Sequence, residues 1–332
     1  MEEIYHALDP HFPENDALED ASDSDNASEF ENIDDIEGDE NFEFQQEEDD
    51  PEKHLKIAIV GRPNVGKSTL LNAIVKEERV MTGPEAGITR DAIAVDWEYE
   101  GRPFRLVDTA GMRRNANVQN NIEKMSVEDS LRAIRLAQIV VLVIDGNAIM
   151  ENQDLQIASH VIDEGRALIV AVNKWDVVKD RTDALKDLQH KLENSLAQVR
   201  DVAFVTMSAL NGKNVGRLLS TIVDVYKVWN IRMPTGQMNR WLRQMESKNP
   251  APLVSGRQNR LKYITQIKTR PPTFALWVSR PEKLPTAYKR YIINGLRRDY
   301  NIPGVPIRLL IRASRNPYTE SHGRRQHTQL LR

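Results

Sequence analysis

The chain lacks several sequence features, and each absence excludes certain classes of protein or site. None of its 332 residues is cysteine, which excludes disulfides and thiolate metal sites and permits a cytoplasmic location. No apolar run approaches the roughly eighteen residues that a membrane span needs. The start has no basic segment followed by an apolar stretch, so we expect no signal peptide. The seven histidines are scattered, and none is paired at zinc-ligand spacing. These absences predict a cytoplasmic protein.

Basic residues are missing from one end of the chain and concentrated at the other. Residues 1–52 hold 22 acidic and no basic residues, so we expect a disordered acidic segment. It serves as a linker or, alternatively, shields the basic end from non-specific RNA. Residues 53–231 are almost neutral, with 24 basic and 23 acidic residues. Residues 232–332 hold 21 basic and 4 acidic residues, a balance that favours a polyanionic partner.

A phosphate-binding loop is predicted by the segment GRPNVGKS, residues 61–68. It follows the apolar run KIAIV, which predicts a buried strand, and it leads into a helix over residues 68–75. Its glycines let the backbone wrap a polyphosphate at the positive end of the helix dipole. Lys67 would reach the β- and γ-phosphates, and the Ser68 hydroxyl would ligate Mg²⁺.

Two further segments predict contacts to metal and γ-phosphate. The strands expected at Ala94–Glu100 and Pro103–Val107 lead to DTAG, in which Asp108 would hold Mg²⁺ through water. The Gly111 amide would then contact the γ-phosphate. Thr89, in the irregular stretch MTGPEAGITRD, would close over Mg²⁺ and γ-phosphate only when GTP is present, which makes it a switch candidate.

The base is predicted to bind at NKWD, residues 173–176, and SAL, residues 208–210. The Asp176 carboxylate can accept hydrogen bonds from N1–H and the 2-amino group of guanine, which adenine cannot supply. Asn173 would brace the loops, the Lys174 stem would cover the base, and the Ala209 amide would donate to the guanine oxygen. The predicted nucleotide-binding residues are Gly61, Arg62, Pro63, Asn64, Val65, Gly66, Lys67, Ser68, Thr69, Asp108, Thr109, Ala110, Gly111, Met112, Asn173, Lys174, Trp175, Asp176, Ser208, Ala209 and Leu210.

These motifs together resemble those of the bacterial GTPase family Der, also called EngA. The resemblance spans about Lys53 to Pro317 and includes GRPNVGKSTLLNAI, GITRD, DTAGMRR, NKWD, SALNG and GRQNRLKYITQIKTRPPTFALWVSRPE. It implies a role in assembly of the large ribosomal subunit. The family has two tandem GTPase domains before a KH-like domain, whereas this chain carries one set of nucleotide motifs. Because MEEIYHALDPHFPEND resembles the end of a first GTPase domain, we expect an N-terminal truncation.

The predicted architecture is α/β. Residues 53–231 form a P-loop NTPase of the Ras-like type, with a doubly wound, mostly parallel sheet, and residues 232–316 form a smaller α+β KH-like domain. A basic flexible tail, 317–332, follows. In the KH-like domain we expect a helix over 235–245, strands over 261–268, 273–279 and 306–312, and a helix with Pro285 in its first turn.

RNA binding is the expected task of the KH-like domain. The Gly-x-x-Gly loop with which KH domains grip single strands is absent between Ile231 and Arg332, so we expect a basic surface to bind the RNA backbone instead. The residues that we expect on this surface are Arg257, Arg260, Lys262, Lys268, Arg270, Arg280, Lys289, Arg290, Arg297 and Arg298. The predicted partner is ribosomal RNA of the large subunit, bound by a monomer.

Hydrolysis is expected to be slow. Met112 follows DTAG where many GTPases have a water-orienting Gln. Asn64 is similar to an Asn at which related bacterial GTPases bind K⁺, and this resemblance implies that Asn64 would hold K⁺ near the β- and γ-phosphates and supply positive charge there. The alternative is that Asn64 only braces its loop. The predicted catalytic residues are Lys67, Thr89, Gly111 and Asn64, and the metal ligands are Ser68, Thr89, Asp108 and Asn64.

Three functions are compatible with these motifs. The first is a GTP-hydrolysing factor of large-subunit assembly, in which nucleotide state controls how the basic domain is presented. The second is a small-subunit GTPase of the Era type, against which DTAG in place of DTPG and the missing Gly-x-x-Gly argue. The third is a GTP-gated RNA-binding module without turnover.

Overall fold

We describe the chain from a computed structural model, in residues 53–77, 95–107, 127–196 and 198–313. Within these residues, six strands form one sheet in the order β2-β3-β1-β4-β5-β6. The β2 strand is antiparallel to β3, and the other neighbours are parallel. The strands are β1 Leu55–Val60, β2 Val95–Tyr99, β3 Arg102–Leu106, β4 Ile139–Asp145, β5 Ala167–Asn173 and β6 Ala203–Thr206.

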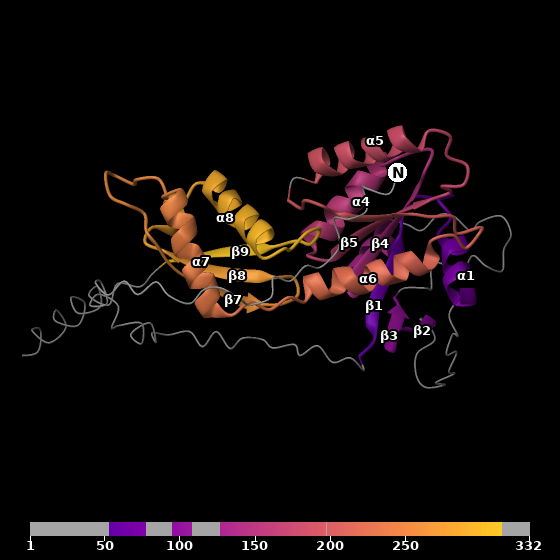
Figure 1. Ribbon diagram of the computed structural model, residues 1–332, viewed down its shortest axis with the longest axis horizontal. Helices are drawn as coiled ribbons and strands as arrows, with labels where there is room; N and C mark the ends of the chain where they lie inside the picture. The colour runs from indigo at the N-terminus through magenta and orange to yellow at the C-terminus, as the bar shows by residue number, and fades with distance from the viewer. Residues whose placement is uncertain (1–52, 78–94, 108–126, 197, 314–332) are drawn as a thin grey trace, which may run out of the picture. The chain divides into compact units, whose positions relative to one another are not determined.

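Helices cover both faces of this sheet. Helix α6 lies on one side and α4 and α5 lie on the other (Figure 1). Apolar residues alternate accordingly along β1, where Ile57 and Ile59 join one buried cluster and Ala58 and Val60 join the other. The helices are α1 Lys67–Glu77, α3 Val127–Leu136, α4 Asn152–Asp163, α5 Arg181–Ser195 and α6 Val215–Trp229. The predicted doubly wound, mostly parallel sheet is confirmed.

The central strands consist of continuous aliphatic residues. The β4 strand reads IVVLVID and β5 reads ALIVAVN, and almost all of these side chains are buried. Such runs are typical of parallel strands with both faces covered. Both strands therefore end at one edge of the sheet, where Asp145 and Asn173 lie opposite each other in the register.

A three-stranded sheet in the order β7-β8-β9 forms the second region. The strands β7 and β8 are antiparallel, whereas β8 and β9 are parallel. The predicted order of helix, strand, strand, helix, strand is confirmed. The elements are α7 Thr235–Lys248, β7 Leu261–Lys268, β8 Thr273–Val278, the short 3-10 helix η4 Pro281–Lys283, α8 Thr286–Asp299 and β9 Arg308–Ala313.

The two helices of this region pack tightly on each other. A Cβ atom at Gly295 of α8 would lie 2.3 Å from Cε of Met245 and 3.0 Å from Cζ2 of Trp241, both on α7. Pro285 does not lie in the first turn of α8, as the sequence predicts, but precedes the helix as its N-cap, with an extended ψ of 147°. Helix α7 also continues three residues beyond the predicted end, to Lys248.

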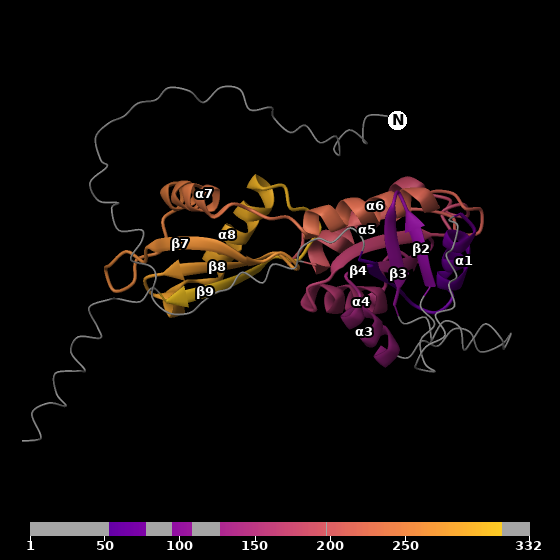
Figure 2. The ribbon, with the colours of Figure 1, turned by 90° about the horizontal axis from the view of Figure 1, so that it is seen from below.

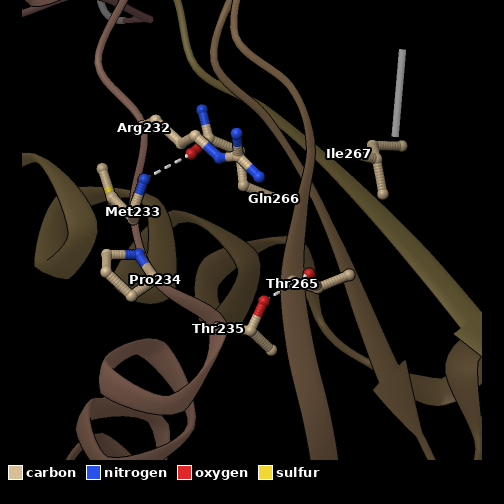
Figure 3. Close-up of a pocket in the computed structure, with 7 residues that line it drawn as sticks. All are labelled: Arg232, Met233, Pro234, Thr235, Thr265, Gln266 and Ile267. Atoms are coloured by element: carbon tan, nitrogen blue, oxygen red, sulfur yellow. Dashed lines mark hydrogen bonds between the residues drawn. The ribbon is translucent and has the colours of Figure 1, made fainter. Parts of the chain in front are cut away.

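A short connection, residues 230–234, joins α6 to α7. The buried side chain of Gln266 on β7 accepts a hydrogen bond from the Met233 amide at 2.8 Å and donates one to the Ile231 carbonyl at 2.8 Å. A third bond joins the hydroxyls of Thr235 and Thr265 at 3.1 Å. Figure 3 shows the Met233–Gln266 and Thr235–Thr265 bonds beside a cavity of about 220 Å³. The connection is thus fastened to the second sheet at several points.

Candidate functional site

The loop between β1 and α1 has a backbone that requires glycine at two positions. Gly61 has a φ of +144° and Gly66 a φ of +96°, both outside the range that L side chains adopt readily. A Cβ atom at Gly61 would lie 2.2 Å from the Val143 carbonyl oxygen, and one at Gly66 would lie 2.3 Å from the Asn173 amide nitrogen. The two glycines therefore let the loop fit closely between the ends of β4 and β5.

Lys67 begins α1 and turns back over this loop. Its ammonium donates hydrogen bonds to the Gly61 carbonyl at 2.9 Å and the Arg62 carbonyl at 2.7 Å. Ser68 and Thr69 follow in the first helical turn, and both side chains are exposed. The amides and hydroxyls of a helix N-terminus form an anion-binding environment, and the Lys67 charge strengthens it.

Asn173, at the end of β5, joins two loops. Its side chain is 3% exposed. It donates a hydrogen bond to the Val65 carbonyl at 2.8 Å and accepts one from the Ala209 amide at 2.9 Å. We expected Asn173 to brace the loops, and these two bonds do so. They connect the glycine-rich loop to the segment SAL, and they occupy the Ala209 amide that we had assigned to the guanine oxygen; that guanine contact stays a prediction.

Lys174 makes contacts that the sequence did not indicate. Its ammonium bonds the Asn64 carbonyl at 2.7 Å and the Asp145 carboxylate at 2.8 Å, and its backbone has a φ of +59°. Partial burial acts to raise the pKa of Asp145, but hydrogen bonds from Lys174 and the Asn147 amide outweigh it and hold that pKa below its usual range. Asn64 itself is exposed, with a φ of +64°.

A cavity of about 250 Å³ lies between the segments NKWD and SAL. Asp176 and Trp175 line it from the first segment, and Ser208, which is buried, lines it from the second. The Asp176 side chain is exposed. Leu210 is 80% exposed and is not among the lining residues. The other residues that line the cavity are Arg181, Thr206, Met207, Asn211, Lys213 and Asn214.

Arg62 uses its side chain to anchor the loop. Its guanidinium bonds both carboxylate oxygens of Asp154, at 3.0 and 2.9 Å, as well as the Glu151 carboxylate and the Ala148 carbonyl. Asp154 is fully buried in the first turn of α4, and this burial raises its pKa although Arg62 acts to lower it. Sequence reasoning missed Asp154, whose only signal was an acidic residue near a helix start.

Six predicted site residues lie outside the described part of the chain: Thr89, Asp108, Thr109, Ala110, Gly111 and Met112. Of the four predicted metal ligands, Ser68 and Asn64 belong to the described residues. The exposed Ser68 hydroxyl beside Lys67 fits the role of a Mg²⁺ ligand at a phosphate site. Among the described residues no three His, Cys, Asp or Glu side chains gather as a metal cluster. No helix there is long and apolar enough to cross a bilayer.

Fold and site together define a P-loop domain of the GTPase class, followed by a KH-like domain. Residues 56–174 match the family described as "50S ribosome-binding GTPase". Residues 232–312 match the family "KH-domain-like of EngA bacterial GTPase enzymes, C-terminal".

Individual similar proteins point to a narrower group than these two family matches. The chain is 52% identical over 269 residues to GTPase Der of Brucella melitensis, an alignment that covers 81% of this chain and 56% of the relative. It is 50% identical over 273 residues to GTPase Der of Parvibaculum lavamentivorans, covering 82% and 58%. A solved structure of Era from Aquifex aeolicus is 18% identical, with a TM-score of 0.38, and covers 79% of this chain and 94% of that one. The predicted resemblance to the Der family is confirmed, and the chain spans about half the length of these curated relatives.

Proposed function

We propose that this chain binds GTP with Mg²⁺, hydrolyses it to GDP and phosphate, and acts in assembly of the large ribosomal subunit. The observation that carries the proposal is the Asn173 side chain, which bonds both Val65 and Ala209. Through these bonds one residue sets the distance between the glycine-rich loop and the cavity beside Asp176. A phosphate site and a base site at a fixed separation suit a nucleotide.

The residues have distinct roles in this proposal. Lys67 exchanges its bonds to loop carbonyls for bonds to the β- and γ-phosphates, and Ser68 holds Mg²⁺. When bound at Ser68, Mg²⁺ would supply positive charge against the phosphates. Asp176 accepts hydrogen bonds from the guanine edge. Thr89, Asp108 and Gly111 complete the γ-phosphate and metal contacts, as predicted from the sequence.

We further propose that turnover is slow and stimulated by K⁺. Because Met112 cannot orient water, charge stabilisation at the phosphates carries more of the catalytic effect. Asn64 lies in the loop with an exposed side chain, and its carbonyl is already held by Lys174. This bond fixes the backbone of Asn64, so the side-chain amide oxygen is the atom that we assign to K⁺.

The basic C-terminal region is the part that we assign to ribosomal RNA. Its described residues 232–313 include 17 Lys and Arg but 3 Asp and Glu. Such an excess attracts a phosphate backbone by a mechanism that salt weakens steeply. Because the connection 230–234 is short and fastened by Gln266, a movement at the end of α6 passes directly to this region. We infer that nucleotide state controls its presentation to rRNA.

Nucleotide binding and single-turnover hydrolysis in K⁺ buffer test the first part of the proposal. We expect fluorescent GTP and GDP to bind with Mg²⁺ at least a hundredfold more tightly than ATP, since adenine leaves Asp176 unpaired. Comparable affinity for ATP would overturn the assignment of the base site. GTP binding without any hydrolysis would instead support a GTP-gated RNA-binding module.

A further inference from the structure

Within residues 232–313, the three-stranded sheet has one face that the helices α7 and α8 do not cover. Figure 2 shows α7 and α8 on the same side of β7, β8 and β9. Toward these helices the sheet presents side chains such as Ile264, Phe274 and Leu276, all fully buried. Because side chains alternate along a strand, the intervening residues lie on the opposite face.

The register of the strands determines which residues share this second face. Tyr263 pairs with Trp277, and Trp277 pairs with Arg312, so the three form one row across the sheet. The adjacent row consists of Thr265, Ala275 and Leu310. We call these six residues the open sheet face; at its edge, the Thr265 hydroxyl bonds that of Thr235, the first residue of α7.

Aromatic rings and a cation dominate the first row. The Tyr263 and Trp277 rings have centroids 5.4 Å apart and meet at 60°, an edge-to-face pair, and both side chains are partly exposed. Arg312 at the end of the row is exposed, and Leu310 in the next row is 37% exposed. Ala275, at the centre of the second row, is small and buried.

The charge around this face selects its partner. Residues 232–313 carry 17 basic and 3 acidic side chains, so a second copy of this region would be repelled. A duplex would offer phosphates but keep its bases stacked inside, out of reach of the rings. An unpaired RNA strand offers both a polyanionic backbone and flat apolar bases, which are the groups that aromatic residues on a basic sheet stack against.

We propose that the open sheet face binds unpaired RNA bases, which stack on Tyr263 and Trp277 while Arg312 pairs with the adjoining phosphate. This inference rests on the proposed function, since it names how the basic region would hold ribosomal RNA. KH domains hold single-stranded RNA with a Gly-x-x-Gly loop, which this region lacks. In this proposal the sheet holds the single strand in place of that loop.

The test measures binding of the full chain to three fluorescent probes of equal charge: a twelve-nucleotide single-stranded RNA, the same strand without bases, and an RNA duplex. We expect the single strand to bind at least tenfold more tightly than the abasic strand at equal salt. Tyr263→Leu and Trp277→Leu keep an apolar side chain but remove the ring. Each should weaken binding of the single strand by about five- to 150-fold and leave the abasic strand unaffected.

Matched controls separate stacking from charge and from unfolding. Arg290→Gln removes an exposed charge from α8, away from the open sheet face, and Arg312→Gln removes one on it. Arg312→Gln should lose more affinity for the single strand than Arg290→Gln does. GTP hydrolysis and a native circular dichroism spectrum show that each variant has folded, and Trp277→Phe should restore binding to within about threefold because a ring is present again.

The outcomes distinguish this inference from the proposed function. If wild type binds RNA but both leucine variants retain its affinity within twofold, the open sheet face is not the site and the RNA role stands. If the abasic strand binds as tightly as the single strand, or the duplex binds more tightly, bases do not stack on the open sheet face, and the RNA role again stands. If wild type binds none of the three probes, the RNA part of the proposed function fails together with the inference.

Discussion

The two sheets of this chain differ in how they are covered. The six-stranded sheet has helices on both faces, and six of the seven side chains of β4 are buried. The three-stranded sheet has helices on one face, and four of the six side chains of β9 are exposed. A sheet covered on both faces can offer a ligand only the loops at the ends of its strands, whereas a sheet covered on one face can offer side chains along its length.

The balance of charged residues also differs between the two regions. Residues 53–231 hold 24 basic and 23 acidic side chains, whereas residues 232–313 hold 17 and 3. In the first region the recognition of phosphate depends on a glycine-rich backbone and one lysine, not on an accumulated positive field. In the second region we propose that it depends on many cations around the open sheet face. We therefore assign a small ligand to the edge of the first sheet and a polymer to the face of the second.

The largest effect is expected when the edge of the first sheet loses Lys67. Lys67→Ala should lower single-turnover GTP hydrolysis by at least about a thousandfold, because the ammonium no longer stabilises charge on the transferred phosphoryl group. RNA binding should be unchanged. The matched control is Lys76→Ala, which removes an exposed lysine from the last turn of the same helix and should keep wild-type turnover. Hydrolysis by Lys67→Ala within tenfold of wild type would show that the loop is assigned wrongly.

A second prediction concerns the ion beside Asn64. Hydrolysis should be about 10² to 10³-fold faster in KCl than in NaCl, because K⁺ supplies charge stabilisation and Na⁺ is too small for its site. The two salts must have equal ionic strength, since screening would otherwise differ. Asn64→Ala should abolish the difference and change nucleotide affinity little. Rates that agree within twofold in the two salts would disprove the K⁺ site.

A third prediction tests the base cavity between NKWD and SAL. Asp176→Asn should weaken GTP binding about a hundredfold and allow binding of xanthosine triphosphate, because the new amide donates to the 2-oxo group that replaces the amine. Asp183→Asn, which changes another exposed carboxylate nearby on α5, serves as the control. Wild-type affinity for GTP in Asp176→Asn, without any binding of the xanthosine nucleotide, would mean that Asp176 does not contact the base.

The smallest effect is expected on the covered face of the second sheet. Gly295→Val places two methyl groups against Met245 and Trp241 and should destabilise the C-terminal region by about 1 to 3 kcal/mol. Gly236→Val, on α7 with no atom within 4 Å of the added Cβ, is the matched control. Urea unfolding followed by Trp fluorescence measures both. Nucleotide affinity should stay at the wild-type level, and a loss of it in Gly295→Val would argue against independent sites.

The strands β1, β2, β3 and β5 of the first sheet could be predicted to within one residue at each end. Runs such as ALIVAV have no polar member, so their burial on both faces was evident. The backbone of the phosphate loop followed from its glycines in the same way. Pro285 was placed wrongly because a proline suits both the N-cap and the first helical turn, and the local sequence does not separate the two.

The contacts of single side chains could not be predicted. Arg62 bonds Asp154, which is 92 residues away, and only the fold brings the two together. The Tyr263–Trp277 pair depends on a shift in register between Leu261 and Tyr263, for which no sequence pattern gave a signal. Tertiary structure therefore supplied the anchors of the site and the open sheet face.

Co-sedimentation with isolated ribosomal subunits tests the central claim most directly. The full chain, with Mg²⁺, KCl and a non-hydrolysable GTP analogue, is centrifuged with large or with small subunits. We predict that it pellets with the large subunit and that Tyr263→Leu reduces the pelleted fraction, because the open sheet face contributes to rRNA binding. Pelleting with the small subunit, or with neither, would contradict a role in large-subunit assembly.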